Sequence, residues 1–255
     1  RVMASAKDIV VKPITAQAAN ALVKRVHYSG KVVNNSTLHF GAYLNDKLEG
    51  VMSFGGSIDK SKVLPLVSGT VWTGMLELNR MAFSDRLPRN SESRCMAVAF
   101  RLIKKHYPHI EWVLSFSDGC QCGDGTIYRA SGFILTGIKV NKTMLMTPHG
   151  EVVADKTFNN SADKKYKGLQ KKDCTPLKGF QLRYIYFLNP EAKARLTVPV
   201  IPFSKIDEIG ASMYKGESIK RDTKATTSDQ LVGGGAIPTI TLHSPYAASK
   251  KTNEA

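Results

Sequence analysis

The chain has 255 residues, and 36 lysines and arginines against 21 aspartates and glutamates give it a formal net charge of +15 at neutral pH. With 42% apolar and 22% charged residues, the composition is that of a folded globular protein and excludes disorder throughout, collagen and a coiled coil. No apolar run approaches the roughly 20 residues of a membrane span. Four cysteines are too few for a disulfide framework, so we expect an intracellular protein.

The positive charge is concentrated in two segments. Residues 80–105 hold seven basic residues against two acidic ones, and residues 156–178 hold seven lysines against two aspartates. A lysine-rich run is often only a solvated loop. A phosphate backbone is, however, the commonest cellular polyanion that can use a charge of +15. We therefore expect a nucleic-acid partner and no membrane partner.

The hydrophobic pattern predicts alternating strands and helices in the first half of the chain. Residues 8–14 alternate as a strand does, and Thr15 can cap the helix that follows, whose apolar positions fall on one face. Two strands, 39–44 and 48–54, are joined by the short turn at 45–47 and predict a hairpin.

The second half continues the pattern with four more strands and two helices. A strand over 75–83 precedes a helix over 93–106, in which apolar residues recur at steps of four, three and four and which Pro108 ends. The remaining elements are a strand over 112–117, a short helix over 125–131, and strands over 133–140 and 181–188. The order βαβββαβαββ predicts an α+β fold with helices flanking a sheet.

The composition also divides the chain. We expect residues 1–7 to be disordered or a non-native start, 8–190 to form the main folded domain, 191–216 to be a C-terminal extension, and 217–255 to be a flexible tail. The tail contains a run of three glycines, many polar residues and few large apolar ones, so it cannot offset its ordering entropy.

Several longer segments resemble one known family. The resemblance to the Mom DNA-modification proteins of Mu-like phages covers roughly residues 8–188 and is carried by His27–Gly30, Glu77–Phe83, Leu87–Arg94, Ser115–Gly119 and Gly123–Phe133. It implies a fold like that of the GCN5-related acetyltransferases (GNAT), with a central mixed, mostly antiparallel sheet. It also implies conversion of the N6 amine of adenine in double-stranded DNA to a carbamoylmethyl derivative, which shields phage DNA from restriction in the host cytoplasm.

The turn before the second long helix departs from the wider acetyltransferase pattern. Those enzymes cradle the cofactor pyrophosphate with Arg/Gln-x-x-Gly-x-Gly/Ala, whereas residues 86–94 contain no glycine. Amides at the helix start can still hold an anion, and this segment suits a cofactor pyrophosphate or a DNA phosphate equally. The phosphate-binding candidates in the two basic segments are Arg86, Arg89, Arg94, Lys164, Lys165 and Lys167.

Two candidate catalytic residues, His27 and Tyr28, follow the first helix in a loop that borders the acceptor site of the acetyltransferase fold. A neutral imidazole can accept the amine proton or ligate a metal, and Tyr28 can stack on an extruded base or hydrogen-bond to it. The alternative for His27 is a helix cap.

Four more candidates complete the set. Asp118 ends a strand, where its carboxylate reaches substrate or only caps an Asx turn. Tyr128 lies where many acetyltransferases carry a tyrosine that protonates a departing thiolate, and its alternative is packing against the sheet. Arg80 would be a fixed cation near developing negative charge, and Ser93 a hydroxyl at the helix entrance or a cap.

The cofactor and the reaction stay open at this point. The resemblance implies iron, which His27 and Asp118 would suit chemically although no facial-triad spacing is present, while Cys120 and Cys122 are expected to be idle thiols. A carbamoylmethyl group is attached by alkylation, with acetyl-CoA or another small carbon donor as its source. The rival functions are an amine N-acetyltransferase that uses acetyl-CoA and a non-catalytic basic DNA-binding protein.

Overall fold

The computed structural model describes residues 4–159, 168–214 and 217–219. The chain divides after Arg221, and all described residues lie in the first of its two units. The predicted flexible tail covers residues 217–255, of which residues 220–255 lie outside the described residues. No helix in these described ranges has the length and apolar character that crossing a membrane requires.

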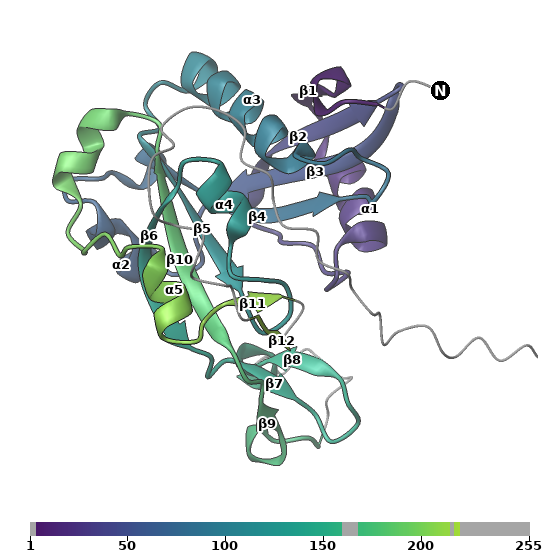
Figure 1. Cartoon of the computed structure of the whole chain (residues 1–255), viewed down its shortest axis with the longest axis vertical. Helices are drawn as coiled ribbons and strands as arrows, with labels where there is room; N and C mark the ends of the chain where they lie inside the picture. The colour runs from purple at the N-terminus through teal and green to yellow at the C-terminus, as the bar shows by residue number, and fades with distance from the viewer. Residues whose placement is uncertain (1–3, 160–167, 215–216, 220–255) are drawn as a thin grey trace, which may run out of the picture. The chain divides into compact units, whose positions relative to one another are not determined.

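The described residues form five α-helices and twelve strands, joined by short 3-10 turns (Figure 1). The helices are α1 (Ala16–Val26), α2 (Lys60–Val63), α3 (Ser91–His106), α4 (Thr126–Ala130) and α5 (Ser204–Glu208). The strands are β1 (Val10–Pro13), β2 (Ser36–Leu44), β3 (Lys47–Gly55), β4 (Met75–Phe83), β5 (Trp112–Asp118), β6 (Ile134–Val140), β7 (Met144–Met146), β8 (Val152–Ala154), β9 (Thr175–Pro176), β10 (Phe180–Phe187), β11 (Met213–Tyr214) and β12 (Glu217–Ser218).

Seven strands form the central sheet in the order β1-β2-β3-β4-β5-β10-β6. Every neighbouring pair is antiparallel except β4 and β5, which are parallel. The predicted mixed, mostly antiparallel sheet with flanking helices is therefore confirmed. The predicted hairpin of β2 and β3 is also present, and Asn45 and Asp46 take φ values of 49° and 60° at its turn, as a two-residue hairpin turn with the twist of the strands requires.

The two parallel strands separate partway along their length (Figure 1). Their pairing is limited to Met75–Glu77 of β4 against Trp112–Leu114 of β5. Beyond these residues β4 continues to pair only with β3, and β5 only with β10. The sheet therefore opens in its middle, and backbone groups on the facing edges of the two strands are left for other partners.

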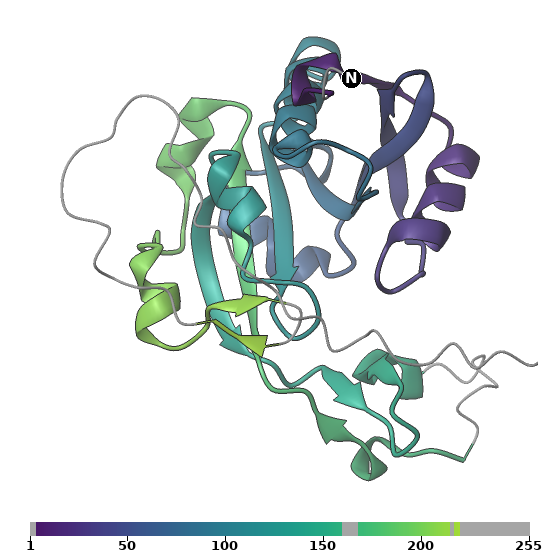
Figure 2. The same cartoon turned by 45° about the vertical axis from the view of Figure 1, so that its right-hand side comes forward.

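The two faces of the sheet carry different layers, as Figures 1 and 2 show. On one face lies the largest apolar cluster, in which Phe100 of α3 contacts Phe54 (6.3 Å between ring centroids) and Phe133 (5.8 Å). On the other face Trp112 and Leu114 pack with residues of α2, and the apolar side of α1 packs on β3 and β4. Burial on both faces explains why β5 begins as an uninterrupted apolar run.

The chain segment that connects β6 to β10 forms a small second sheet with the order β8-β7-β9. It was not predicted, because strands of two or three residues are too short for a period to be recognised. The buried side chain of Asn141 links the start of β7 to the residue that follows β9. Its Nδ2 donates to the carbonyls of Met144 (2.9 Å) and Leu177 (2.8 Å).

The ends of the described unit are more ordered than the composition suggests. Residues 6–8 form a capped 3-10 turn within the segment expected to be disordered. In the expected extension 191–216, Ile206 and Ala211 are buried in the main cluster. The expected boundary at 216/217 falls inside a hairpin, because β11 pairs with β12. The folded unit therefore continues past residue 190 to at least residue 219.

Candidate functional site

Five of the predicted catalytic residues lie near one another where β4 and β5 separate. Besides desolvation, the pKa of the Tyr28 phenol is shifted by the charges of Asp118 and Arg80 and by the hydroxyl of Tyr128. The ring of His27 lies 4.2 Å from that of Tyr28, and Arg80 acts on its imidazole. We refer to these five residues as the cluster.

His27 is the C-cap residue of α1, and its imidazole accepts a hydrogen bond from the amide of Ser29 at Nδ1 (3.1 Å). The Ser29 hydroxyl lies 2.8 Å from the same nitrogen. Burial and the nearby Arg80 charge lower the pKa of His27 to about 4, so the ring is neutral at physiological pH. Because Nδ1 accepts, the proton of the neutral ring is assigned to Nε2. His27 therefore caps the helix and also offers an N–H donor to the cluster.

Tyr28 presents its ring to solvent, with 53% of its surface exposed. Protein atoms nevertheless surround its hydroxyl, and this desolvation, followed by the charge of Asp118, raises the pKa of Tyr28 well above its usual range. The phenol keeps its proton at every physiological pH. An exposed ring with a protonated hydroxyl can both stack on a base and donate a hydrogen bond.

Arg80 is held by two backbone carbonyls, with Nε donating to Lys31 (3.0 Å) and Nη1 to Asn79 (3.1 Å). Burial lowers the pKa of its guanidinium, which remains a cation because an arginine is not deprotonated in proteins. Tyr28 and Glu77 are the two groups that favour its charged form. Arg80 is thus a fixed positive charge inside the cluster.

Glu77 belongs to this site although the sequence did not single it out. It lies at the last paired position between β4 and β5. Burial raises the pKa of its carboxyl, while hydrogen bonds from Ser57 and Asn79 and the charge of Arg80 oppose the rise. A carboxylate between the apolar residues Leu76 and Leu78 of a central strand was the signal available in the sequence.

Asp118 ends β5 and does cap a turn, as its alternative role predicted. Oδ1 accepts from the amide of Cys120 and Oδ2 from the side chain of Gln121, both at 3.0 Å. Desolvation is the main reason that the pKa values of Tyr28 and of the Cys122 thiol are raised. The negative charge of the same carboxylate raises both of them further. The capping and the electrostatic roles therefore coexist in one side chain.

Tyr128 of α4 packs between Phe133 and Tyr184, with 5.2 Å between ring centroids in each case. Burial raises its pKa to about 12, and the hydroxyl of Ser115 opposes the rise. Ser115 follows Leu114, the last residue of β5 that pairs with β4, and its fully buried hydroxyl has no hydrogen-bond partner at ordinary distance among the described residues. The Tyr128 phenol and the Ser115 hydroxyl thus lie near the point where the sheet opens.

The glycine-free turn before α3 contains a residue that adopts a glycine-like conformation. Asn90 precedes the helix with φ of 68°, and asparagine is among the few residues that tolerate this region. Arg89 is exposed and Arg94 lies in the first turn of the helix. Arg86 instead pairs with the buried Glu49 (3.1 Å), so part of its charge is already compensated.

The other candidates are not joined to the cluster by the described contacts. Ser93 lies in the first turn of α3 and donates through its hydroxyl to the carbonyl of Asn90 (3.2 Å), so Asn90, and not Ser93, is the N-cap residue that the sequence left open. Three lysines of the second basic segment lie outside the described residues and stay predictions: Lys164, Lys165 and Lys167.

The side chains do not fit the iron site that the resemblance implied. Within the described ranges no group of three or more His, Cys, Asp and Glu side chains could hold a metal ion. His27 uses Nδ1 to accept from Ser29, and Asp118 uses both oxygens within its own turn. His27 and Asp118 therefore offer too few ligands, and no step is assigned to iron.

A family model described as the Mom protein family matches residues 8–205. The chain belongs to the Mom family. Among curated proteins it is 35% identical over 195 residues to "Methylcarbamoylase mom" of Escherichia phage Mu, which covers 74% of this chain and 80% of the relative. The resemblance identified in the sequence is thereby confirmed.

Two of the solved structures to which this chain is similar are acetyltransferases. An IAA acetyltransferase from Bacillus cereus is 10% identical with a TM-score of 0.39, covering 70% of this chain and 99% of its own. A GNAT family acetyltransferase from Elizabethkingia anophelis with acetyl-CoA bound is 13% identical with a TM-score of 0.40, covering 71% and 98%. Similarities of this size indicate nothing about substrate or cofactor, and the fold class rests on the strand order described above.

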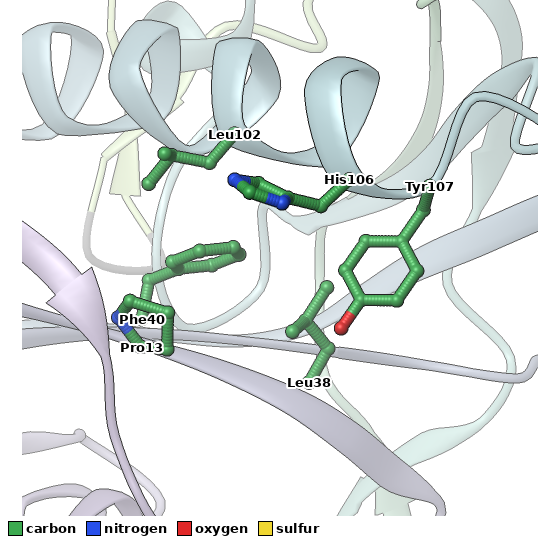
Figure 3. A pocket seen from close by; sticks show the side chains of 6 residues that line it. All are labelled: Pro13, Leu38, Phe40, Leu102, His106 and Tyr107. Carbon is green, nitrogen blue, oxygen red and sulfur yellow. The ribbon is translucent and has the colours of Figure 1, made fainter.

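A separate cavity lies beneath the C-terminal end of α3, where the helix passes over β1 and β2 (Figure 3). Its volume is about 450 Å³. No residue of the cluster lines it, and its lining residues are Pro13, Leu38, Phe40, Leu102, His106 and Tyr107. The cavity is thus distinct from the candidate site.

Proposed function

We propose that this Mom-family protein is a DNA-modifying transferase that converts adenine in phage DNA to N6-carbamoylmethyladenine and so protects that DNA from restriction in the host cytoplasm. The observation that carries the proposal is the cluster itself, in which a fixed cation, two protonated phenols and two carboxylates surround the opening of the sheet. The name of the phage Mu relative and the charge of +15 support the same substrate.

The acceptor sets the first requirement. The N6 amine of adenine is conjugated with the ring and is paired in duplex DNA, so the base must leave the helix before it reacts. Tyr28 suits the binding of an extruded base, because its exposed ring can stack and its hydroxyl can donate to a ring nitrogen. His27 can donate a second hydrogen bond from Nε2.

The amine must lose a proton as its bond to carbon forms. Glu77 is the better acceptor, because burial raises the pKa of its carboxyl above the usual range, which makes it a stronger base. Asp118 already accepts two hydrogen bonds and instead supplies negative charge beside Tyr28. Arg80 can stabilise negative charge that develops in the transition state.

The leaving group must gain a proton, and Tyr128 can supply it. Its pKa of about 12 keeps the hydroxyl protonated. If the carbon donor is carried by coenzyme A, the amides at the start of α3 with Arg89 and Arg94 would hold its pyrophosphate. The new bond joins the adenine nitrogen to a methylene carbon, which direct acyl transfer from a thioester does not form, so the donor must present that methylene carbon with a leaving group. Another small carbon donor would need the same proton from Tyr128.

Mass spectrometry of nucleosides from DNA made in cells that express the protein tests the proposal. We expect an adenosine with a carbamoylmethyl mass increment, absent when Tyr128→Phe is expressed at the same level. An acetyl increment would favour an amine acetyltransferase instead. Unmodified adenosine together with retained DNA binding would reduce the protein to a non-catalytic DNA-binding protein.

A further inference from the structure

Part of the central sheet carries an outward row of polar and aromatic side chains beside the cluster. Residues that lie directly opposite in antiparallel strands share a face. Phe116 of β5 is opposite Arg183 of β10, and Asp118 is opposite Gln181, which is in turn opposite Lys139 of β6. These five residues therefore share one face, which we call the open face.

The open face begins where the apolar layer on its side of the sheet ends. Trp112 and Leu114, which share this face, are fully buried together with Ile185 of β10. Phe116 comes next on the same face and is 48% exposed. A half-exposed phenylalanine in an inner strand of a seven-stranded sheet is a position where water, rather than a helix, meets the ring.

The charge of the open face matches a polyanion. Lys139 and nearby Lys142 are exposed. Arg183 of β10 is held by Thr136 of the neighbouring strand β6, because it donates from Nε to the Thr136 hydroxyl (3.1 Å) and from Nη2 to the Thr136 carbonyl (2.7 Å). Asp118 is the one acidic member of the five-residue face, and both of its oxygens accept hydrogen bonds.

We propose that the DNA strand carrying the target adenine lies along the open face, with Phe116 stacked on a neighbouring base and Lys139 paired with a phosphate. Two residues along a strand span roughly 7 Å, so Phe116 lies about one nucleotide from Asp118 and hence from the Tyr28 region. Aromatic rings flanked by cations on a sheet are a general means of holding single-stranded nucleic acid. This inference rests on the proposed function and adds the path of the substrate.

Fluorescence anisotropy with a labelled adenine-containing DNA, as duplex and as single strand, tests the open face. We expect Phe116→Leu to weaken binding to the single strand by roughly five- to hundredfold, the range for loss of one stacked base. We expect Lys139→Gln to lower the slope of log K against log salt by about 1. Tyr107→Leu, at the C-terminal end of α3, and Lys47→Gln, exposed in the β2–β3 hairpin and outside both basic segments, are the matched controls and should leave both quantities unchanged.

Thermal melting of each variant shows whether the fold survives, since Phe116 is half exposed and Leu keeps an apolar side chain. Unchanged affinity of a folded Phe116→Leu variant, or equal losses in the controls, would overturn the open face as the DNA path. Preference for an RNA of the same sequence over DNA would also overturn it. If wild-type protein binds DNA through Phe116 but leaves adenosine unmodified, the proposed function fails while the open face stands.

Discussion

Replacement of Tyr128 by phenylalanine separates proton donation from packing. Phenylalanine keeps the ring that contacts Phe133 and Tyr184 at 5.2 Å and removes only the hydroxyl. Loss of a general acid slows a reaction by about 10² to 10⁴, so modified adenosine should fall at least a hundredfold. Loss of one neutral hydrogen-bonding group changes the free energy of unfolding by about 1 kcal/mol, a shift in melting temperature of about 2–4 °C.

The assay compares modified adenosine, melting temperature and DNA affinity on the same preparations. Tyr186→Phe is the matched control, because its ring stacks on Phe100 (4.3 Å) in the same aromatic group and carries no assigned chemistry. Since the pKa of Tyr128 is about 12, its hydroxyl should cause no change in activity between about pH 6 and 9. Modification within threefold of wild type in Tyr128→Phe would refute the role of this residue as an acid.

Four further changes test other parts of the unit. Asp118→Asn should abolish modification but melt nearly as wild type, because the Asn oxygen can accept from Cys120 and the Gln121 amide can turn to accept from the new N–H; near-normal modification would remove Asp118 from the site. Truncation after Arg221 should leave modification intact, whereas Met213→Ala should cost about 2–3 kcal/mol in calorimetry, since Met213 is buried against the Asp118 turn; an intact melting temperature would contradict this. The last change replaces three lysines by glutamine: Lys164, Lys165 and Lys167. It should lower the slope of log K against log salt for DNA binding by up to about 3. An unchanged slope would mean that this segment is only a solvated loop.

The sequence predicted the elements that have a long hydrophobic pattern. It did not predict the short elements that only tertiary contacts define. β4 occupies 75–83 as expected, because nine residues suffice to recognise a strand. α3 begins two residues before its expected start, since Asn90 initiates it through a left-handed backbone rather than a side-chain cap. The strands of the small sheet were missed because only their pairing defines them.

Five residues predicted for the site lie near one another in the fold, and their assignment to a catalytic site stays a prediction. The family resemblance selected His27, Tyr28, Arg80, Asp118 and Tyr128, and the fold brings these distant segments together. Local sequence could not show that the caps of α1 and of the Asp118 turn also face the cluster. It marked Glu77 only as a carboxylate between two apolar residues of a strand, and the significance of that carboxylate comes from the separation of β4 and β5.

The titration of His27 gives a test of the site that does not depend on catalysis. Burial and Arg80 lower the pKa of this imidazole from 6.5 to about 4, so between these values the unfolded chain binds a proton that the folded protein does not. Stability therefore rises with pH across this window, is fully present above about 6.5 and is lost as pH falls toward 4. A shift of this size corresponds to at most about 3 kcal/mol, and the partial exposure of the ring reduces it.

His27→Asn removes the titration and keeps the cap, because the Asn oxygen can replace Nδ1 as acceptor for the Ser29 amide. We expect the wild type to lose melting temperature between about pH 6.5 and 4 relative to this variant, by several degrees. Thermal melts of both proteins at closely spaced pH values measure the difference, with high salt as a check that weakens the contribution of Arg80. A difference between the two proteins that does not change with pH would mean that His27 is not buried beside Arg80, and the cluster would lose the member that links α1 to it.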